Sequence, residues 1–274
     1  MPALSGHLTL RAAAGADGRT VLAHQSFCAP FHLGKAYWDG TALIVNVVNA
    51  TAGILEGDTL NAEVGVEAGA SVLLTSPAAS RAFTTRGAGA LDASCRQDYT
   101  VAAGGWLEVM GEPLVPHRAS RYRQATRLSV EPGGKLYFTE VLAPGRAAHD
   151  EGWEWEALQI DLSLRLGGEL IYHERTRQSG EELAAMAALA GMGKPWFATL
   201  LLVAEELDRE EGWRRELHGL HRPGLRIGFS RLRPGAWIGR LIGDGPRALR
   251  EALASIRERL QPLLPRLRAD ARKL

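Results

Sequence analysis

The sequence predicts a mainly β fold: a β-helix-like stack of repeated hairpins, with two or three α-helices in the C-terminal third. Short alternating segments separated by Gly, Pro, Ala or Asp clusters dominate residues 1–177. A turn pattern recurs within them at nearly regular spacing, and helical patterns begin only afterwards. We therefore expect one domain over 1–274, in which a β-rich repeat region (1–177) is followed by a dependent mixed α/β part (178–274).

The predicted strands alternate as expected for a sheet with one buried face. In TLNAEVGV, Leu60, Ala62, Val64 and Val66 are apolar and the residues between them are mostly polar. Many such short segments are typical of sandwiches, barrels and solenoids. The other segments are HLTLRA, TVLAHQSF, TALIVNVVN, SVLLT, LDASCRQDYTV, WLEVM, RYRQATRLSV, KLYFTEVL, WEALQIDLSLRL and ELIYHERTR.

A repeated turn follows four of these strands. VEAGASVLLTS begins at Val66, VAAGGWLEVMG at Val101, VEPGGKLYFTE at Val130 and LRLGGELIYHE at Leu164. Each copy carries a small pair of residues where a tight turn needs tolerance of positive φ. We expect four hairpins that stack edge to edge into a layered sheet.

The C-terminal third mixes helices with strands. Ser179 and Glu182 form a capping box that starts a helix, and a second helix is expected within 207–220. PWFATLLLVAEE, LRIGFSRL and AWIGRLIG read as strands between and after these helices. Asp244 is the expected cap of the last helix, and Pro246 lies in its first turn. Its apolar stripe, which we expect to face the core rather than a partner, is Leu249, Leu253, Ile256, Leu260 and Leu263.

Composition and net charge limit the partners and the cellular location that we expect for this protein. The 274 residues carry a net charge of +1, so neither nucleic acid nor an anionic membrane is expected as a partner. We find no signal peptide and no run of about 20 apolar residues, so we place the protein in the cytoplasm. Cys28 and Cys95 lie far apart, outside any metal-binding spacing, and are expected to be reduced.

The usual catalytic and cofactor motifs are absent from the sequence. It contains no GxSxG, P-loop, HExxH, or GxGxxG opening a βαβ unit. His218 and His221 are three residues apart, but a glycine lies between them and a proline follows. A solvated helix end is therefore favoured over a metal site for this pair.

Two glutamates stand on apolar strand faces. Glu140 shares its face with Phe138 and its apolar neighbours, and Glu174 shares its face with Tyr172. A carboxylate on a buried face is costly unless it is paired, protonated or in contact with internal water. Both glutamates follow their repeated turn at the same offset, and Ser76 has that offset in the first copy.

Stacked repeats would place these oxygens along one internal track. Such a track suits a hard or borderline divalent cation that is held loosely and passed along. The equally weighted alternative is a pair of independent salt bridges at strand ends. The nearby arginines that could form them are Arg146, Arg175 and Arg177.

The order of several motifs adds a resemblance. AGILEGDTL contains Asp58, TSPAASRAF contains Ser80, EVLAPGRAAHDEGW begins with Glu140, and YHERTR contains Glu174. Together with LEVMGEPLV and the final amphipathic helix, they resemble the urease accessory proteins called UreD, or UreH in some organisms. The resemblance covers nearly the whole chain and implies a single UreD-like domain with a β-helix-like stack of strands.

The resemblance also implies a function. Such a protein is a non-enzymatic maturation factor that binds urease apoprotein, recruits the accessory proteins UreF and UreG, and helps deliver nickel. No cofactor is expected to be tightly bound; Ni²⁺ would pass transiently along an internal polar passage. By position, the family's passage residues correspond here to Asp58, Ser80, Glu140 and Glu174.

Two other classes of protein remain open. A purely structural adaptor would use the carboxylates only for folding. A β-solenoid enzyme, for instance a glycosidase, would use Glu140 and Glu174 as acid and base. That reaction requires an open cleft with the two carboxyl groups ~5–10 Å apart across it.

Overall fold

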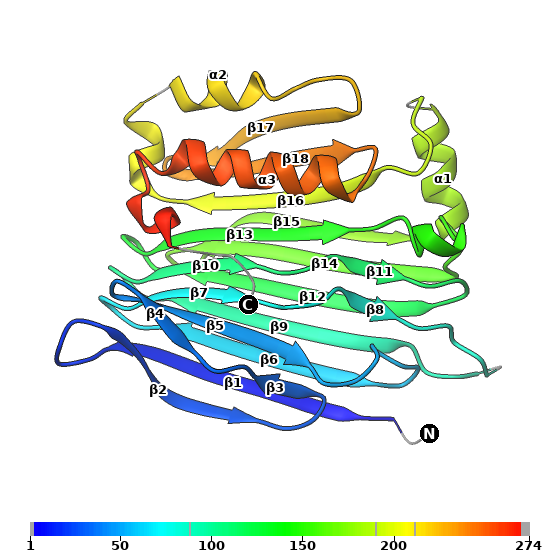
Figure 1. Ribbon diagram of the computed structural model, residues 1–274, viewed down its shortest axis with the longest axis horizontal. Helices are drawn as coiled ribbons and strands as arrows, with labels where there is room; N and C mark the ends of the chain where they lie inside the picture. The colour runs from blue at the N-terminus through cyan, green and yellow to red at the C-terminus, as the bar shows by residue number, and fades with distance from the viewer. Residues whose placement is uncertain (1–2, 88, 190, 211, 270–274) are drawn as a thin grey trace.

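Two facing β-sheets make up most of the molecule in the computed structural model, which describes residues 3–87, 89–189, 191–210 and 212–269 (Figure 1). The predicted mainly β class is confirmed. The first sheet has seven strands in the order β15-β14-β12-β9-β6-β1-β2. Their bounds are β1 (Ser5–Ala14), β2 (Thr20–Phe27), β6 (Thr59–Val66), β9 (Ala93–Val101), β12 (Arg121–Val130), β14 (Ala157–Leu166) and β15 (Glu169–Gln178).

The second sheet has eleven strands in the described ranges. Eight follow the order β17-β18-β16-β13-β10-β7-β5-β3, and the short strands β4, β8 and β11 are attached to them. Their bounds are β3 (Phe31–Leu33), β4 (Tyr37–Asp39), β5 (Ala42–Asn49), β7 (Ser71–Thr75), β8 (Ser80–Ala82), β10 (Trp106–Met110), β11 (Leu114–Pro116), β13 (Lys135–Leu142), β16 (Trp196–Val203), β17 (Leu225–Arg233) and β18 (Ala236–Gly243).

The helices lie where the sequence predicted them. They are α1 (Gly180–Leu189), α2 (Gly212–His218) and α3 (Pro246–Leu260), with 3₁₀ turns at Ala147–His149, Glu205–Asp208 and Pro265–Arg268. The capping box is confirmed, because Ser179 and Glu182 exchange hydrogen bonds of 2.7 and 3.2 Å. The cap of α3 is Gly245 rather than Asp244. The N–H of Asp244 donates to the carbonyl of Gly224, which keeps Asp244 with the sheet.

Three of the four repeated turns are corners between the sheets, so the predicted hairpins are wrong there. β6, β9 and β12 pair in parallel within the first sheet, and β7, β10 and β13 pair in parallel within the second. Gly69, Gly104 and Gly133 turn these corners with φ of 74°, 74° and 82°. Hydrogen bonds of 3.2 and 3.1 Å join the first corner to the second and the second to the third. The repeat is therefore a stack of corners.

The fourth turn is a true hairpin and changes the predicted alignment. Gly167 and Gly168 both have positive φ, and the antiparallel pair Leu166 and Glu169 closes this two-residue loop within the first sheet. The register aligns Leu166, not Leu164, with Val130. Glu174 therefore lies on the opposite sheet from Glu140, and their predicted equivalence in the repeat is wrong. The sheets do not close on one another, so the β-helix detail is not confirmed.

Most of the apolar interior falls into three clusters, and a small fourth one contains Ile44, Leu73 and Ala269. The sheet cluster, between the two sheets, includes Leu8, Val64, Val72, Leu107 and Phe138. The end cluster, against α1 and the preceding loop, includes Ile54, Leu60, Trp153, Trp155 and Leu158. The helix cluster, between the second sheet and α2 and α3, includes Trp106, Tyr137, Leu200, Leu249 and Ile256. The second sheet is thus covered on both faces, with α3 lying across β16 and β18 (Figure 1). No helix in the described ranges is long and apolar enough to cross a membrane.

Candidate functional site: a polar band between the sheets

Polar side chains interrupt the apolar interior between the sheet cluster and the end cluster. Strand alternation turns them inward from both sheets, because each lies in phase with the apolar residues of its strand. We call this set the polar band. Its members are Cys95, Gln97, Gln124, Thr126 and Glu174 from the first sheet, and Glu140, Thr199 and Arg240 from the second.

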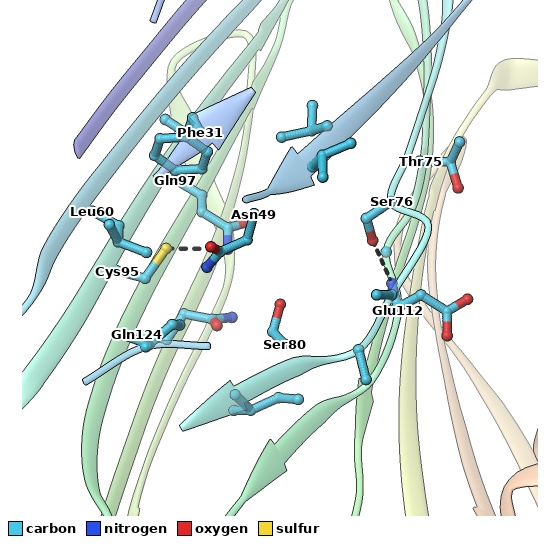
Figure 2. A pocket seen from close by; sticks show the side chains of 18 of the residues that line it. Phe31, Asn49, Leu60, Thr75, Ser76, Ser80, Cys95, Gln97, Glu112 and Gln124 are labelled. Atoms are coloured by element: carbon cyan, nitrogen blue, oxygen red, sulfur yellow. Dashed lines mark hydrogen bonds between the residues drawn. The ribbon is translucent and has the colours of Figure 1, made fainter. Parts of the chain in front are cut away.

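A cavity of about 410 Å³ adjoins the polar band where β7 and β10 end. Figure 2 shows the side chains of Cys95, Gln97 and Gln124 on one side of this cavity and those of Ser76 and Glu112 on the other. Ser80 lies between these two groups (Figure 2). At the rim, the Ser76 hydroxyl accepts a 3.1 Å hydrogen bond from the N–H of Glu112. Hydroxyl, amide and charged side chains, Arg81 and Glu112 among them, thus line part of a wall that is otherwise apolar.

Glu140 lines the cavity and links the two sheets. Its carboxylate accepts a hydrogen bond from the Nε2 of Gln124, and the Gln124 carbonyl accepts a 3.1 Å bond from the Tyr122 hydroxyl. Burial raises the pKa of Glu140 to about 7, and the nearby Glu174 charge adds to the rise. The Gln124 hydrogen bond and Arg240 act in the opposite direction. Near neutral pH the group is therefore divided between its two protonation states.

Glu174 lies beyond Glu140, at the edge of the sandwich. It accepts a 2.8 Å hydrogen bond from Tyr172 and forms an ion pair with Arg240, which also donates to the Thr199 hydroxyl. The registers align Glu140 with Thr199 and Thr199 with Arg240 across three adjacent strands. The side chains of Glu174 and Arg240 are 38% and 43% exposed, so this pair faces solvent as well as the interior. Glu174 thus forms a salt bridge, but its partner is Arg240 and not one of the three arginines named from the sequence.

Asp58 lies apart from the cavity lining. The residue is 2% exposed, and its two carboxylate oxygens accept hydrogen bonds from the backbone N–H groups of Leu4 and Leu55, both at 2.8 Å. These bonds hold the turn before β6 against the segment that leads into β1. Of the four predicted residues, the structure places Ser80 and Glu140 in the cavity wall, Glu174 next to Glu140, and Asp58 elsewhere.

Several members of the polar band were missed from the sequence. Gln124 and Thr126 stand at inward positions of RYRQATRLSV, in phase with Tyr122, and that alternation was readable. The role of Arg240 could not be predicted from the sequence, because its partner Glu174 is 66 residues away.

The rings of His218 and His221 stack with centroids 5.9 Å apart. Within the described ranges, no three His, Cys, Asp or Glu side chains gather into a group that could hold a metal ion.

Comparison with known proteins identifies the family of this chain. A family model described as UreD urease accessory protein matches residues 4–273. A urease accessory protein UreD of Opitutus terrae is 50% identical over 273 residues, which cover 98% of this chain and 99% of that protein. UreD of Yersinia pseudotuberculosis is 37% identical over 178 residues, covering 62% of this chain and 54% of that protein. The chain therefore belongs to the UreD family of urease accessory proteins.

Proposed function

We propose that this protein acts in urease maturation by binding urease apoprotein together with UreF and UreG, and that it helps deliver Ni²⁺ along the polar band. Family membership supports the role in maturation. The observation that carries the passage is Glu140, a carboxylate set between two sheets in the wall of a cavity of about 410 Å³. A carboxylate enclosed between two sheets is costly to a fold that does not use it, even where it is only partly buried.

Nickel is the cargo in this proposal, so weak ligands are an advantage. The cavity offers the carboxylates of Glu140 and, at its rim, Glu112, together with the Ser80 hydroxyl and amide oxygens. A borderline cation exchanges rapidly among such separate oxygens. Arrival of the cation beside Glu140 favours the ionised carboxylate and releases its proton. Departure allows the proton to return, because the pKa of Glu140 is already near 7. One group can therefore bind and release a cation without a tight site.

The ion pair between Arg240 and Glu174 controls whether a cation can move beyond Glu140 in this proposal. Arg240 holds Glu174 and donates to Thr199, so its positive charge stands at the edge of the band. A cation that reaches this edge competes with Arg240 for the Glu174 carboxylate. The proposed route therefore runs from the cavity rim near Ser80 to Glu140, and it continues to Glu174 only when the ion pair opens.

The test is reconstituted urease activation with Glu140→Gln and Glu174→Gln, with nickel content and complex assembly measured separately. We expect both variants to assemble with apo-urease and to lower activity and nickel content together. Glu63→Gln is the matched control, because Glu63 is an exposed glutamate on the outward face of β6. Normal nickel content in both variants, with assembly intact, would falsify the passage and leave the structural adaptor. If the wild-type protein does not assemble with urease apoprotein, UreF and UreG, the maturation role itself is refuted.

The glycosidase alternative receives no support from the relatives, which are named as accessory proteins. Glu174, its proposed second carboxylate, is held by Tyr172 and Arg240. We therefore propose a non-enzymatic role, in the cytoplasm and without nucleic acid or membrane partners. Hydrolysis of an aryl glycoside panel that is lost in Glu140→Gln would reverse this choice.

A further inference from the structure

A second hollow lies on the outward face of the first sheet, away from the polar band. It has a volume of about 300 Å³ and is lined by side chains of β12, β14 and β15 and of the loop before β9. Its chemistry differs from that of the cavity, because arginines dominate its wall. The residues that matter are Asp92, Arg121, Arg123, Gln159 and Arg177.

The strand registers place three of these side chains in one row. Arg123 of β12 aligns with Gln159 of β14, which aligns with Arg177 of β15. Neighbouring strands are about 4.8 Å apart, so the backbones of the two arginines are separated by about 10 Å. Arg121 lies two residues before Arg123 and therefore faces the same side. Long arginine side chains can converge on one small group across this distance.

Asp92 holds two of the arginines in fixed orientations. Its Oδ1 accepts from the Nε of Arg121 at 2.7 Å, and its Oδ2 accepts from the Nε of Arg123 at 2.6 Å. The Asp92 side chain is only 11% exposed, and these guanidinium groups lower its pKa although burial opposes them. The terminal nitrogens of Arg123 make no hydrogen bond to any residue that the structure describes. Asp92 thus orders the guanidinium groups without using all their donors.

Arg177 supplies the charge that remains uncompensated. Asp92 and Glu156 offset two of the three arginines, since Glu156 lies 3.2 Å from Arg121. The Arg177 side chain is exposed and makes no hydrogen bond or ion pair within the described part of the chain. The Gln159 amide next to it is likewise free to donate there. The hollow therefore presents ordered donors and one net positive charge.

We propose that this hollow binds a phosphate-type oxyanion, either free phosphate or the phosphate group of a small monoester. A planar guanidinium group can donate two parallel hydrogen bonds to two oxygens of a phosphate. Such charge-assisted hydrogen bonds are stronger than neutral ones. A volume of about 300 Å³ has room for the phosphate and part of an attached molecule. The site is on the opposite face of the sheet from the polar band, and it does not depend on nickel.

The test is calorimetric titration of the full chain at low ionic strength with inorganic phosphate, adenosine monophosphate and hexaglutamate. We expect saturable binding of phosphate or the monophosphate, at least tenfold weaker in Arg177→Gln and partly retained in Arg177→Lys. Tighter binding of the monophosphate identifies an ester as the ligand, and tighter binding of inorganic phosphate identifies the free ion.

Arg127→Gln is the matched control for the charge. Arg127 lies on the same strand and the same face as Arg123, but it pairs with Asp98 outside the hollow. The Arg127→Gln variant should bind the phosphate probes as tightly as the wild type does. Arg177→Gln has no partner to disturb, so an unchanged melting temperature is expected. No saturation by either phosphate probe, an equal loss in Arg127→Gln, or tighter binding of hexaglutamate would overturn the oxyanion site.

Discussion

Replacing Glu140 by glutamine should stabilise the protein, and only above the pH at which the free side chain ionises. Glutamine keeps the size and the hydrogen-bonding oxygen of glutamate but carries no charge. The amide of Gln124 can rotate to present its oxygen or its nitrogen to the new side chain. The substitution therefore removes the charge with little change in packing.

The magnitude follows from the position of the Glu140 pKa. Its ordinary value is 4.5 and burial raises it to about 7, so the folded state retains the proton more strongly than the unfolded chain. At about 1.36 kcal/mol per pH unit, ionisation in the folded state costs at most about 3 kcal/mol. The free energy of unfolding of the wild type therefore falls as pH rises from about 4.5 to 7 and carries the full cost above pH 7. Because the side chain is only partly buried, we expect Glu140→Gln to gain about 1–3 kcal/mol at pH 8.

The assay is urea unfolding of both proteins at pH 5, 6, 7 and 8, with Glu63→Gln as the exposed control. The difference between wild type and Glu140→Gln should be small at pH 5 and should grow through pH 7, whereas the control should show no such growth. Other titrating groups cancel in this difference. A difference that is constant with pH, or a destabilised variant at pH 8, would show that Glu140 is not held in a costly ionised state.

Two further predictions concern buried polar contacts. Arg257→Met should lower the free energy of unfolding by about 3–5 kcal/mol, because it leaves the fully buried Glu108 beneath α3 without its ion-pair partner. The double variant Glu108→Met/Arg257→Met should recover most of that loss in urea unfolding; failure to recover would assign the loss to packing. Asp58→Ala should cost about 1–3 kcal/mol and speed hydrogen exchange at the amides of Leu4 and Leu55, because both lose a buried acceptor. Unchanged exchange at these amides would contradict the structural role of Asp58.

The elements of this fold were readable from local patterns. The alternation in TLNAEVGV corresponds to β6, with Leu60, Ala62, Val64 and Val66 buried. The capping box at Ser179 begins α1 as expected. In both cases the signal is contained within a few residues, because burial on one strand face and capping of a helix end are local properties.

The pairing of the strands could not be predicted from such local patterns. A Gly-containing turn between two strands serves equally well as a hairpin or as a corner between two sheets, and only the partners of the strands decide. Gly104 turns a corner, whereas Gly167 turns a hairpin, although both follow similar motifs. Strand pairing is a long-range property, so the position of Glu174 opposite Glu140 could not be derived from their offsets.

The candidate site was recovered in part for the same reason. Glu140 and Ser80 lie in the cavity wall. The contacts that give each carboxylate its chemistry come from distant segments, such as Arg240 at Glu174 and the N–H of Leu4 at Asp58. A role of these four residues in nickel transfer stays a prediction.

The polar band also bears on how this sequence tolerates change. It lies between the sheet cluster and the end cluster. Among the described side chains assigned to these two clusters, only Phe31 packs against both. A side chain that grows or shrinks on one side therefore has few apolar neighbours on the other side to disturb. Substitutions such as Val64→Ile and Leu158→Met should combine additively, whereas pairs within one cluster should compensate each other. The sheet cluster and the end cluster can therefore change in composition with little effect on each other, provided that the polar band between them is kept.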